Sequence, residues 1–377
     1  MVRKLDVFAG VGLTLCTLGF TASAQQARYV TLDAPGAVGG TEPVQINLGG
    51  TVAGYSVDGN GVFHGFLRSP QGKYTMFDVA GAGTNPNASN GTFPAGINVF
   101  GVVAGYYNDA NVVSHGFVRS AEGKITTFDA PGADTNPADA AGTIVSGMND
   151  LGAISGYYSD TKGVSHGFVR SPGGKFTSFD APGAGGYGTY AIGPLNLEGA
   201  IVGFYTDTNF LYHAFVRNPD GQFATFVGPG SCDTGVPEGC YGSGTYNINL
   251  FGTSVGAYQD NSGNFVSHGF VRTADGKITT FEAPGAGTGT GQGTGFDQIA
   301  GLNITGAVTA NYLDGNDVYH GFLRAADGKI TTFDAPGADL NAGDYAGTTP
   351  VSLNDLGVVA GYYVDSSFVV HGFLRFP

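Results

Sequence analysis

The sequence predicts an all-β protein, and its composition, a repeated pattern and short strand-like segments together indicate this class. The 377 residues include 66 Gly and 17 Pro, and both residue types weaken helix interiors. Hydrophobic residues make up 42% of the chain and aromatic residues 12%, so the chain has apolar surface to bury. The composition therefore excludes both a mostly helical protein and a disordered Gly-rich linker.

The N-terminus has the features of a secretory signal peptide. Arg3 and Lys4 precede an apolar stretch over 7–20, and Ala22-Ser23-Ala24 is a small-residue cleavage site. We therefore expect a signal peptide over 1–24 and one mature domain over 25–377, which is secreted, periplasmic or held at the cell surface. No other apolar run approaches the length of a membrane span, so no integral membrane segment is expected.

Four short motifs recur seven times. All seven histidines begin H-G-F or H-A-F, at spacings of 47 to 55 residues, and each Phe is followed two residues later by Arg. These are His64, His115, His166, His213, His268, His320 and His371. An Asp precedes each His by six residues, or by eight in one copy: Asp58, Asp109, Asp160, Asp207, Asp260, Asp314 and Asp365. The other two motifs are F-D-A-P-G-A, in which Val227 replaces the acid of one copy, and N-x-x-G.

Each repeat divides into four short strands joined by polar, Gly-containing turns. In the third copy the first strand ends near Asn149, and the other three strands span 153–158, 164–170 and 175–179. Seven such units predict a seven-bladed β-propeller of four-stranded antiparallel blades. The chain begins with a segment that matches a fourth strand and ends after a third strand, so we expect the N-terminal strand to complete the last blade and close the ring. A linear β-solenoid is the alternative.

The repeat resembles bacterial extracellular repeat proteins of the HAF type, named after the tripeptide His-Ala-Phe. The resemblance covers nearly all of the mature chain through H-[GA]-F-x-R and N-x-x-G-x-x-x-G-Y, although the literal tripeptide occurs once, at His213-Ala214-Phe215. It implies export and repeated β structure, and it implies no reaction.

A group that every unit repeats is expected to hold the unit together or to bind a ligand seven times. We expect the His and the preceding Asp to form a buried polar pair that fixes one hairpin, with a pH switch or repeated metal ligands as alternatives. The Asp of F-D-A-P-G-A is expected to cap its own turn. The repeated Arg is expected to contact a neighbouring blade or an edge strand.

The function expected from these features is an exported, non-catalytic binding propeller. Its ligand would be a glycan, a cell-envelope component or a protein. H-E-x-x-H, G-x-S-x-G and a phosphate loop are all missing, and 16 basic against 30 acidic residues argue against nucleic acid. The alternatives are an extracellular hydrolase or lyase that uses Asp, Glu, Tyr or Arg at the channel mouth, and a purely structural envelope protein. We expect a monomer.

The connections after F-D-A-P-G-A and the hairpins with the repeated Asp should share one acidic, variable face, where a ligand would bind. The fifth copy of F-D-A-P-G-A diverges most, and its loop supplies the candidate ligand contacts Asp233, Glu238, Tyr241 and Tyr246. Cys232 and Cys240 flank this loop and are expected to form a disulfide, with two free thiols as the alternative. Ca²⁺ is the metal that the polar turns would suit, through Asp58, Asp260, Asp314 and Asp317.

Overall fold

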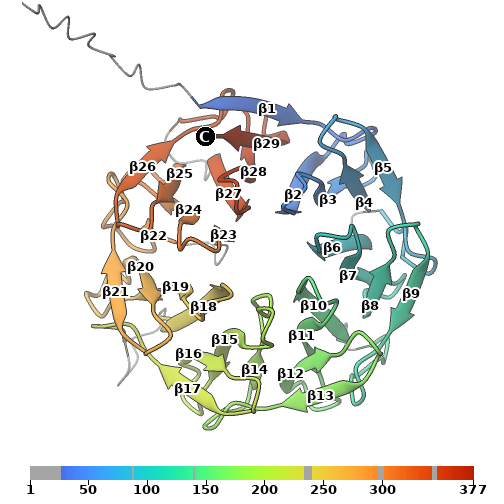
Figure 1. Ribbon diagram of the computed structural model, residues 1–377, viewed down its shortest axis with the longest axis horizontal. Helices are drawn as coiled ribbons and strands as arrows, with labels where there is room; N and C mark the ends of the chain where they lie inside the picture. The colour runs from blue at the N-terminus through green and yellow to red at the C-terminus, as the bar shows by residue number, and fades with distance from the viewer. Residues whose placement is uncertain (1–26, 87–88, 139–140, 233–239, 296–300, 342–345) are drawn as a thin grey trace, which may run out of the picture.

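The computed structural model describes residues 27–86, 89–138, 141–232, 240–295, 301–341 and 346–377. The predicted signal peptide, Asp233 and Glu238 lie outside these ranges. The regular secondary structure of the described residues consists of β-strands, without a helix, which confirms the all-β class. Figure 1 shows the strands in small sheets arranged around a central axis, as in a propeller, with the first strand of each sheet nearest the axis.

Successive strands pair antiparallel in groups, which we call units 1 to 7. Unit 1 contains β2 (Gly40–Ile46), β3 (Val52–Val57), β4 (Phe63–Arg68) and β5 (Tyr74–Phe77). Unit 2 contains β6 (Gly91–Ile97), β7 (Val103–Asn108), β8 (Ser114–Arg119) and β9 (Ile125–Phe128). Unit 3 contains β10 (Thr143–Met148), β11 (Ile154–Ser159), β12 (Ser165–Arg170) and β13 (Phe176–Phe179). Unit 4 contains β14 (Thr189–Tyr190), β15 (Ile201–Thr206), β16 (Tyr212–Arg217) and β17 (Phe223–Phe226). Unit 5 contains β18 (Ser243–Ile248), β19 (Ser254–Gln259), β20 (Ser267–Arg272) and β21 (Ile278–Phe281).

The last two units have irregular strand composition. Unit 6 has a divided inner strand, β22 (Gly293–Thr294) and β23 (Gly301–Leu302), followed by β24 (Val308–Leu313), β25 (Tyr319–Arg324) and β26 (Ile330–Phe333). Unit 7 contains β27 (Gly347–Leu353), β28 (Val359–Val364) and β29 (Val370–Phe376), and β1 (Arg28–Leu32) from the N-terminus pairs with β29 over five residues.

One parallel bridge joins each unit to the next. The bridged pairs are Phe63–Gly91, Ser114–Gly142, Ser165–Gly188, Tyr212–Gly242, Ser267–Gly293, Tyr319–Gly347 and Val370–Gly40. Through these bridges the strands of units 1, 2, 5, 6 and 7 form one 21-stranded sheet. The bridges beside units 3 and 4 involve residues outside the strands, so these units remain two four-stranded sheets. The glycine is required here: Gly347 has φ 114°, and a Cβ on it would overlap the Tyr319 carbonyl.

The antiparallel order of strands gives the arrangement of units two different ends. We call the end that carries the second-to-third strand hairpins and the connections after each fourth strand the loop face. We call the end that carries the N-x-x-G turns and the third-to-fourth strand turns the turn face. The N-x-x-G turns are closed by their Asn: Asn149 Oδ1 accepts hydrogen bonds from Leu151 N (3.1 Å) and Ala153 N (3.0 Å).

Aromatic rings form the core within and between the units. The Phe of H-G-F or H-A-F is fully buried in every unit, at 0–1% exposure: Phe66, Phe117, Phe168, Phe215, Phe270, Phe322 and Phe373. The Phe of F-D-A-P-G-A contacts this ring in the next unit, as Phe77 does with Phe117 at a centroid distance of 6.1 Å. A Cβ on Gly65 would lie 2.8 Å from the Phe77 ring, so the glycine of H-G-F provides bare backbone on which that ring packs.

Hydroxyl groups attach each unit to the connection that enters it. The Thr92 Oγ1 atom accepts a hydrogen bond from Val79 N (3.0 Å), and the equivalent buried Thr or Ser accepts one in the other units. Because this bond repeats at every junction, neighbouring units keep the same relative placement. Among the described residues, no helix is long and apolar enough to span a membrane.

Candidate functional site

Six of the seven repeated histidines lie on the loop face between two acidic side chains, and His213 lies beside one. In six units His Nδ1 lies 2.5–3.0 Å from the acid of F-D-A-P-G-A, fourteen residues downstream or, for His371, on the N-terminal segment. The acids at Nδ1 are Asp33, Asp78, Asp129, Asp180, Glu282 and Asp334. His Nε2 lies 3.2–3.9 Å from the Asp of the preceding hairpin in all seven units.

Tyrosine rings cover these imidazoles. In six units the second-strand Tyr packs on the His ring at centroid distances of 5.0–5.2 Å, as in Tyr107–His115 and Tyr363–His371. Ser56 occupies the equivalent position opposite His64 in unit 1. In five units the imidazole is therefore fixed by a ring on one side and by a carboxylate at each nitrogen, whereas His64 lacks the ring and His213 lacks one carboxylate.

The expected contact between each His and the preceding Asp is present, but a second acid lies closer in six units. The His side chains keep 18–28% of their surface exposed, so the pair is not buried, and the shorter contact is to the F-D-A-P-G-A acid. The hairpin Asp has the turn-capping role that we had expected for that acid, because Asp160 Oδ1 accepts from Lys162 N (2.8 Å) and Val164 N (3.0 Å). Both differences have one cause: the strand after each hairpin returns fourteen residues later to the same face.

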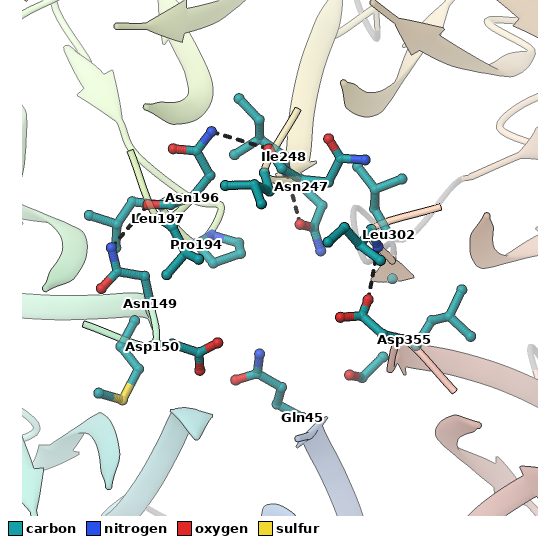
Figure 2. A pocket seen from close by; sticks show the side chains of 18 of the residues that line it. Gln45, Asn149, Asp150, Pro194, Asn196, Leu197, Asn247, Ile248, Leu302 and Asp355 are labelled. Atoms are coloured by element: carbon teal, nitrogen blue, oxygen red, sulfur yellow. Dashed lines mark hydrogen bonds between the residues drawn. The ribbon is translucent and has the colours of Figure 1, made fainter. Parts of the chain in front are cut away.

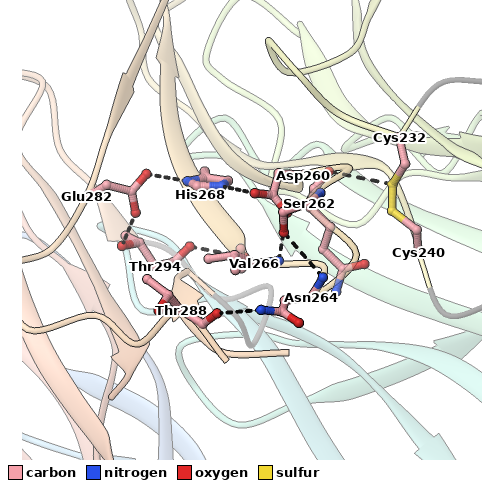
Figure 3. Close-up of polar contacts among 12 residues, drawn as sticks. Cys232, Cys240, Asp260, Ser262, Asn264, Val266, His268, Glu282, Thr288 and Thr294 are labelled. Carbon is pink, nitrogen blue, oxygen red and sulfur yellow. Dashed lines mark hydrogen bonds and ion pairs between the residues drawn. A yellow bond between two sulfur atoms is a disulfide. The ribbon is translucent and has the colours of Figure 1, made fainter. Parts of the chain in front are cut away.

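The acids change the protonation of the histidines. The hydrogen bond that His115 donates to Asp129 raises the pKa of His115, and the bond to Asp334 does the same for His320. Burial lowers the pKa of His268, but Glu282 and Asp260 outweigh that effect and the net shift is upward (Figure 3). The pKa of Asp160 is lowered, first by its backbone hydrogen bond from Val164. Ion pairing is therefore favoured in mildly acidic solution.

The turns proposed for Ca²⁺ use their carboxylates in other ways. Asp58 Oδ1 accepts from Asn60 N and Val62 N, and Asp314 Oδ1 accepts from Asn316 N and Val318 N. Asp260 accepts from Ser262 N and Val266 N, and Asp317 accepts from Gln292 Nε2. Over the described ranges, no group of three or more His, Cys, Asp or Glu side chains is arranged to hold a metal ion. The Ca²⁺ site stays a prediction.

The divergent loop of the fifth copy is only partly described. Cys232 and Cys240 form a disulfide, as expected, and both are buried (Figure 3). The two candidate tyrosines differ in their exposure to solvent. Tyr241 is exposed and lies 5.6 Å from the Tyr212 ring, whereas Tyr246 lies within β18 and burial raises its pKa.

The repeated Arg lies over an aromatic ring of the preceding unit. In six units the guanidinium carbon lies 4.6–5.1 Å from the centroid of the F-D-A-P-G-A Phe, as Arg217 does over Phe179. The contact joins neighbouring units, which is one of the two roles expected for this Arg.

A cavity of about 230 Å³ opens around the central axis at the turn face. Figure 2 shows residues from several units converging on it, among them the polar side chains of Gln45, Asp150, Asn247 and Asp355. Gln45 Oε1 accepts a hydrogen bond from Ile97 N (2.7 Å), so part of this polarity connects units 1 and 2. The binding site was expected at the opposite face, and a site at the channel mouth was expected only for the alternative hydrolase or lyase.

The N-x-x-G asparagines form a belt around this cavity. Side-chain amides donate to the next Asn carbonyl at 2.9–3.2 Å in the steps Asn47–Asn98, Asn149–Asn196, Asn196–Asn249, Asn249–Asn303 and Asn354–Asn47. The other two steps are bridged by carboxylates that accept backbone N–H groups, Asp150 from Val99 and Asp355 from Ile304. The regular N-x-x-G spacing was the available signal, but the sequence did not reveal that these amides link units.

One hydrogen-bonded pair, Glu42 with Tyr55, has no counterpart in the other repeats. The Tyr55 hydroxyl donates to Glu42 Oε2 at 2.6 Å, between the first two strands of unit 1. Burial raises the pKa of Glu42, and the hydrogen bond from Tyr55 partly opposes this shift.

Comparison with known proteins does not assign a family. No family model matches the chain, and no curated protein matches it in sequence. Among solved structures, the BP39L lectin from Burkholderia pseudomallei is 11% identical with a TM-score of 0.49, over 93% of this chain and 96% of that one. The Aleuria aurantia lectin in complex with Fucα1-6GlcNAc is also 11% identical, with a TM-score of 0.38 over 89% and 91%.

A puromycin hydrolase is 11% identical with a TM-score of 0.48, over 90% of this chain and 55% of that one. These likenesses are too weak to assign an activity. The resemblance to HAF-type proteins stays a prediction.

Proposed function

We propose that the seven units close into a seven-bladed β-propeller. The parallel bridge found between successive units also occurs between Val370 and Gly40, which belong to the last and the first unit. The seam carries three further contacts: β1 pairs with β29, Asp33 binds His371, and the Asn354 amide donates to the Asn47 carbonyl. Equivalent contacts at the seam and elsewhere favour a closed ring over the alternative linear solenoid.

The loop face is our proposed recognition surface of an exported, non-catalytic binding protein. The observation that carries this proposal is the concentration of carboxylates there, with Lys162 as the one lysine or arginine of that face among the described residues. The described acids of this face are Asp33, Asp58, Asp78, Asp109, Asp129, Asp134, Asp160, Asp180, Asp207, Asp260, Glu282, Asp314, Asp317, Asp334, Asp339 and Asp365.

The repeated histidines support binding rather than catalysis. Each is fixed between carboxylates or beside one, and a group that recurs in all units does not form a unique catalytic set. The ligand class remains a glycan, an envelope component or a protein, and the negative field favours a partner that carries positive charge.

Binding to cationic probes tests this proposal. Mature protein would be titrated with a chitosan oligosaccharide, polylysine and a neutral dextran at 20 and 300 mM NaCl. We expect binding of the cationic probes, weakened by salt. Replacing the exposed acids at Asp33, Asp78 and Asp180 with Asn should weaken it several-fold.

The matched control replaces three exposed acids of the turn face, as Glu122→Gln, Asp220→Asn and Asp327→Asn. This variant should bind like the wild type. Binding that responds equally to both variants, or no binding of any cationic probe, would contradict the proposal.

The Glu42–Tyr55 pair is the observation that favours the second candidate, a hydrolase or lyase at the channel. A carboxyl group with a raised pKa is suited to act as a general acid. A screen of polysaccharides and esters with the wild type and Glu42→Gln tests it. Turnover that the substitution abolishes would support catalysis, and a silent panel with folded protein would eliminate it.

A further inference from the structure

The turn face exposes a ring of large apolar side chains, although turns at this position usually carry polar residues. Eight exposed side chains occupy the two middle positions of the N-x-x-G turns, and we call them the crown. They are Leu48, Val99, Phe100, Leu151, Leu197, Phe251, Ile304 and Leu356. All seven turns contribute at least one of them.

The asparagine belt brings the crown residues together around one opening. The belt links each N-x-x-G turn to the next, so side chains that are about 50 residues apart in sequence become neighbours. Leu197 and Ile304 line the 230 Å³ central cavity, and Leu48 and Val99 line an adjoining one of about 180 Å³. Phe251 lines a third cavity, of about 430 Å³, between units 4 and 5.

The crown is large enough for a protein interface. Phe100 is 72% exposed, Leu151 and Phe251 66%, and Leu356 65%, and together the eight side chains present the equivalent of about four fully exposed ones. At roughly 150–200 Å² per large apolar side chain, this is about 700 Å². The largest apolar patch on a typical monomer is about 300–600 Å², and a standard interface buries about 800 Å² on each partner.

Charges determine which partner fits the crown. The surrounding third-to-fourth strand turns form a collar that carries both signs of charge. Glu122, Asp275 and Asp327 each stand two residues before a lysine, and the other three turns carry Lys73, Lys175 or Asp220 alone. Such a collar is complementary to itself when two copies meet about a two-fold axis. An anionic lipid surface would instead meet these acids and the exposed Glu198.

We propose that two copies of the chain associate through their crowns, turn face to turn face. The acidic loop faces then point outward on both copies, away from each other. This inference goes beyond the recognition function proposed for the loop face and replaces our sequence-based expectation of a monomer.

The mass of the mature protein in solution tests the association. Sedimentation velocity and light scattering at 1–50 μM should show a dimer of the wild type. The triple variant Phe100→Ser, Leu151→Ser, Phe251→Ser should be monomeric, with a dissociation constant raised about 100-fold or more. An unchanged circular dichroism spectrum and melting temperature would show that the variant is folded.

The control is a triple variant of apolar residues on the loop face that are 49–63% exposed, Phe210→Ser, Leu340→Ser and Phe368→Ser. It should remain a dimer. The inference is overturned if the wild type is monomeric throughout, if the crown variant stays dimeric, or if monomers co-sediment with phosphatidylglycerol vesicles through the crown. Loop-face binding is measured separately, so its failure leaves this result unaffected.

Discussion

Replacing Asn354 with Asp tests the closed ring at its seam. The Asn354 Nδ2 atom donates to the Asn47 carbonyl at 3.2 Å across 307 residues of sequence, and both residues are buried. The Oδ1 atom accepts from Leu356 N (3.1 Å) and Val358 N (3.0 Å) within the turn. A carboxylate keeps the two turn bonds, removes the donor and leaves the buried Asn47 carbonyl without that partner.

The expected cost follows from the one bond that is lost. The Asn47 carbonyl keeps its hydrogen bond from Gly50 N (3.0 Å), so the loss is that of one hydrogen bond, about 0.5–1.5 kcal/mol, and repulsion between the new carboxylate and the carbonyl adds to this. Asn196→Asp is the matched change inside the ring, because Asn196 donates to the Asn249 carbonyl at 3.1 Å and accepts from Ala200 N at 2.9 Å. Both variants should therefore lose similar free energy of unfolding.

Equilibrium urea unfolding at pH 7 measures both losses. The chain has 19 Tyr and no Trp, so tyrosine fluorescence and far-ultraviolet circular dichroism are the appropriate signals. A loss of more than about 1 kcal/mol in Asn196→Asp, with Asn354→Asp indistinguishable from wild type, would show that the seam contact does not contribute and would refute a closed ring.

Three further predictions concern the repeated core and the ionic contacts. Phe168→Ala should cost about 3–5 kcal/mol of unfolding free energy because the ring is fully buried, and a loss below about 1 kcal/mol would contradict that burial. Gly65→Ala should lower the melting temperature because its Cβ would lie 2.8 Å from the Phe77 ring, and an unchanged melt would contradict this packing. Because the pKa of His115 is raised, its ion pair contributes its full stability below pH 6.5, the ordinary pKa of His, and this contribution is lost as the pH rises through the raised pKa. Because the pKa of Asp160 is lowered, its contribution is lost as the pH falls below 3.8. Melting temperatures should therefore be highest between these limits and decrease towards pH 9, less steeply in His115→Gln; a flat or rising profile above pH 6.5 would refute the contribution.

Much of the fold could be predicted because the repeat records local physics many times over. Positive-φ glycines, turn-closing Asp and Asn side chains and short apolar segments depend on neighbours within a few residues, so they are visible in the sequence. The strand segments predicted for the third copy agree with β11, β12 and β13 to within two residues. The role of the Arg and the disulfide between Cys232 and Cys240 were also anticipated.

The candidate site was less predictable because its contacts span units. The spacing predicted the contact of His166 with Asp160, which lies at 3.5 Å, but it did not predict the shorter contact of 2.7 Å that strand pairing gives with Asp180. The exposure of Phe100 and Leu151 could not be distinguished from core packing by residue type alone. The central cavity at the turn face likewise depends on how the inner strands of several units meet.

The sequence by itself determined the all-β class, the repeated four-strand unit and the positions of its turns, because these follow from interactions within about 50 residues. Only the tertiary structure decided which acid binds each histidine, which amides link the turns into a belt and which apolar side chains remain at the surface. Those outcomes depend on bringing the ends of the chain and its neighbouring units together, as the pairing of β1 with β29 shows. Partners separated by as many as 338 residues, such as Asp33 and His371, have no local pattern that identifies them.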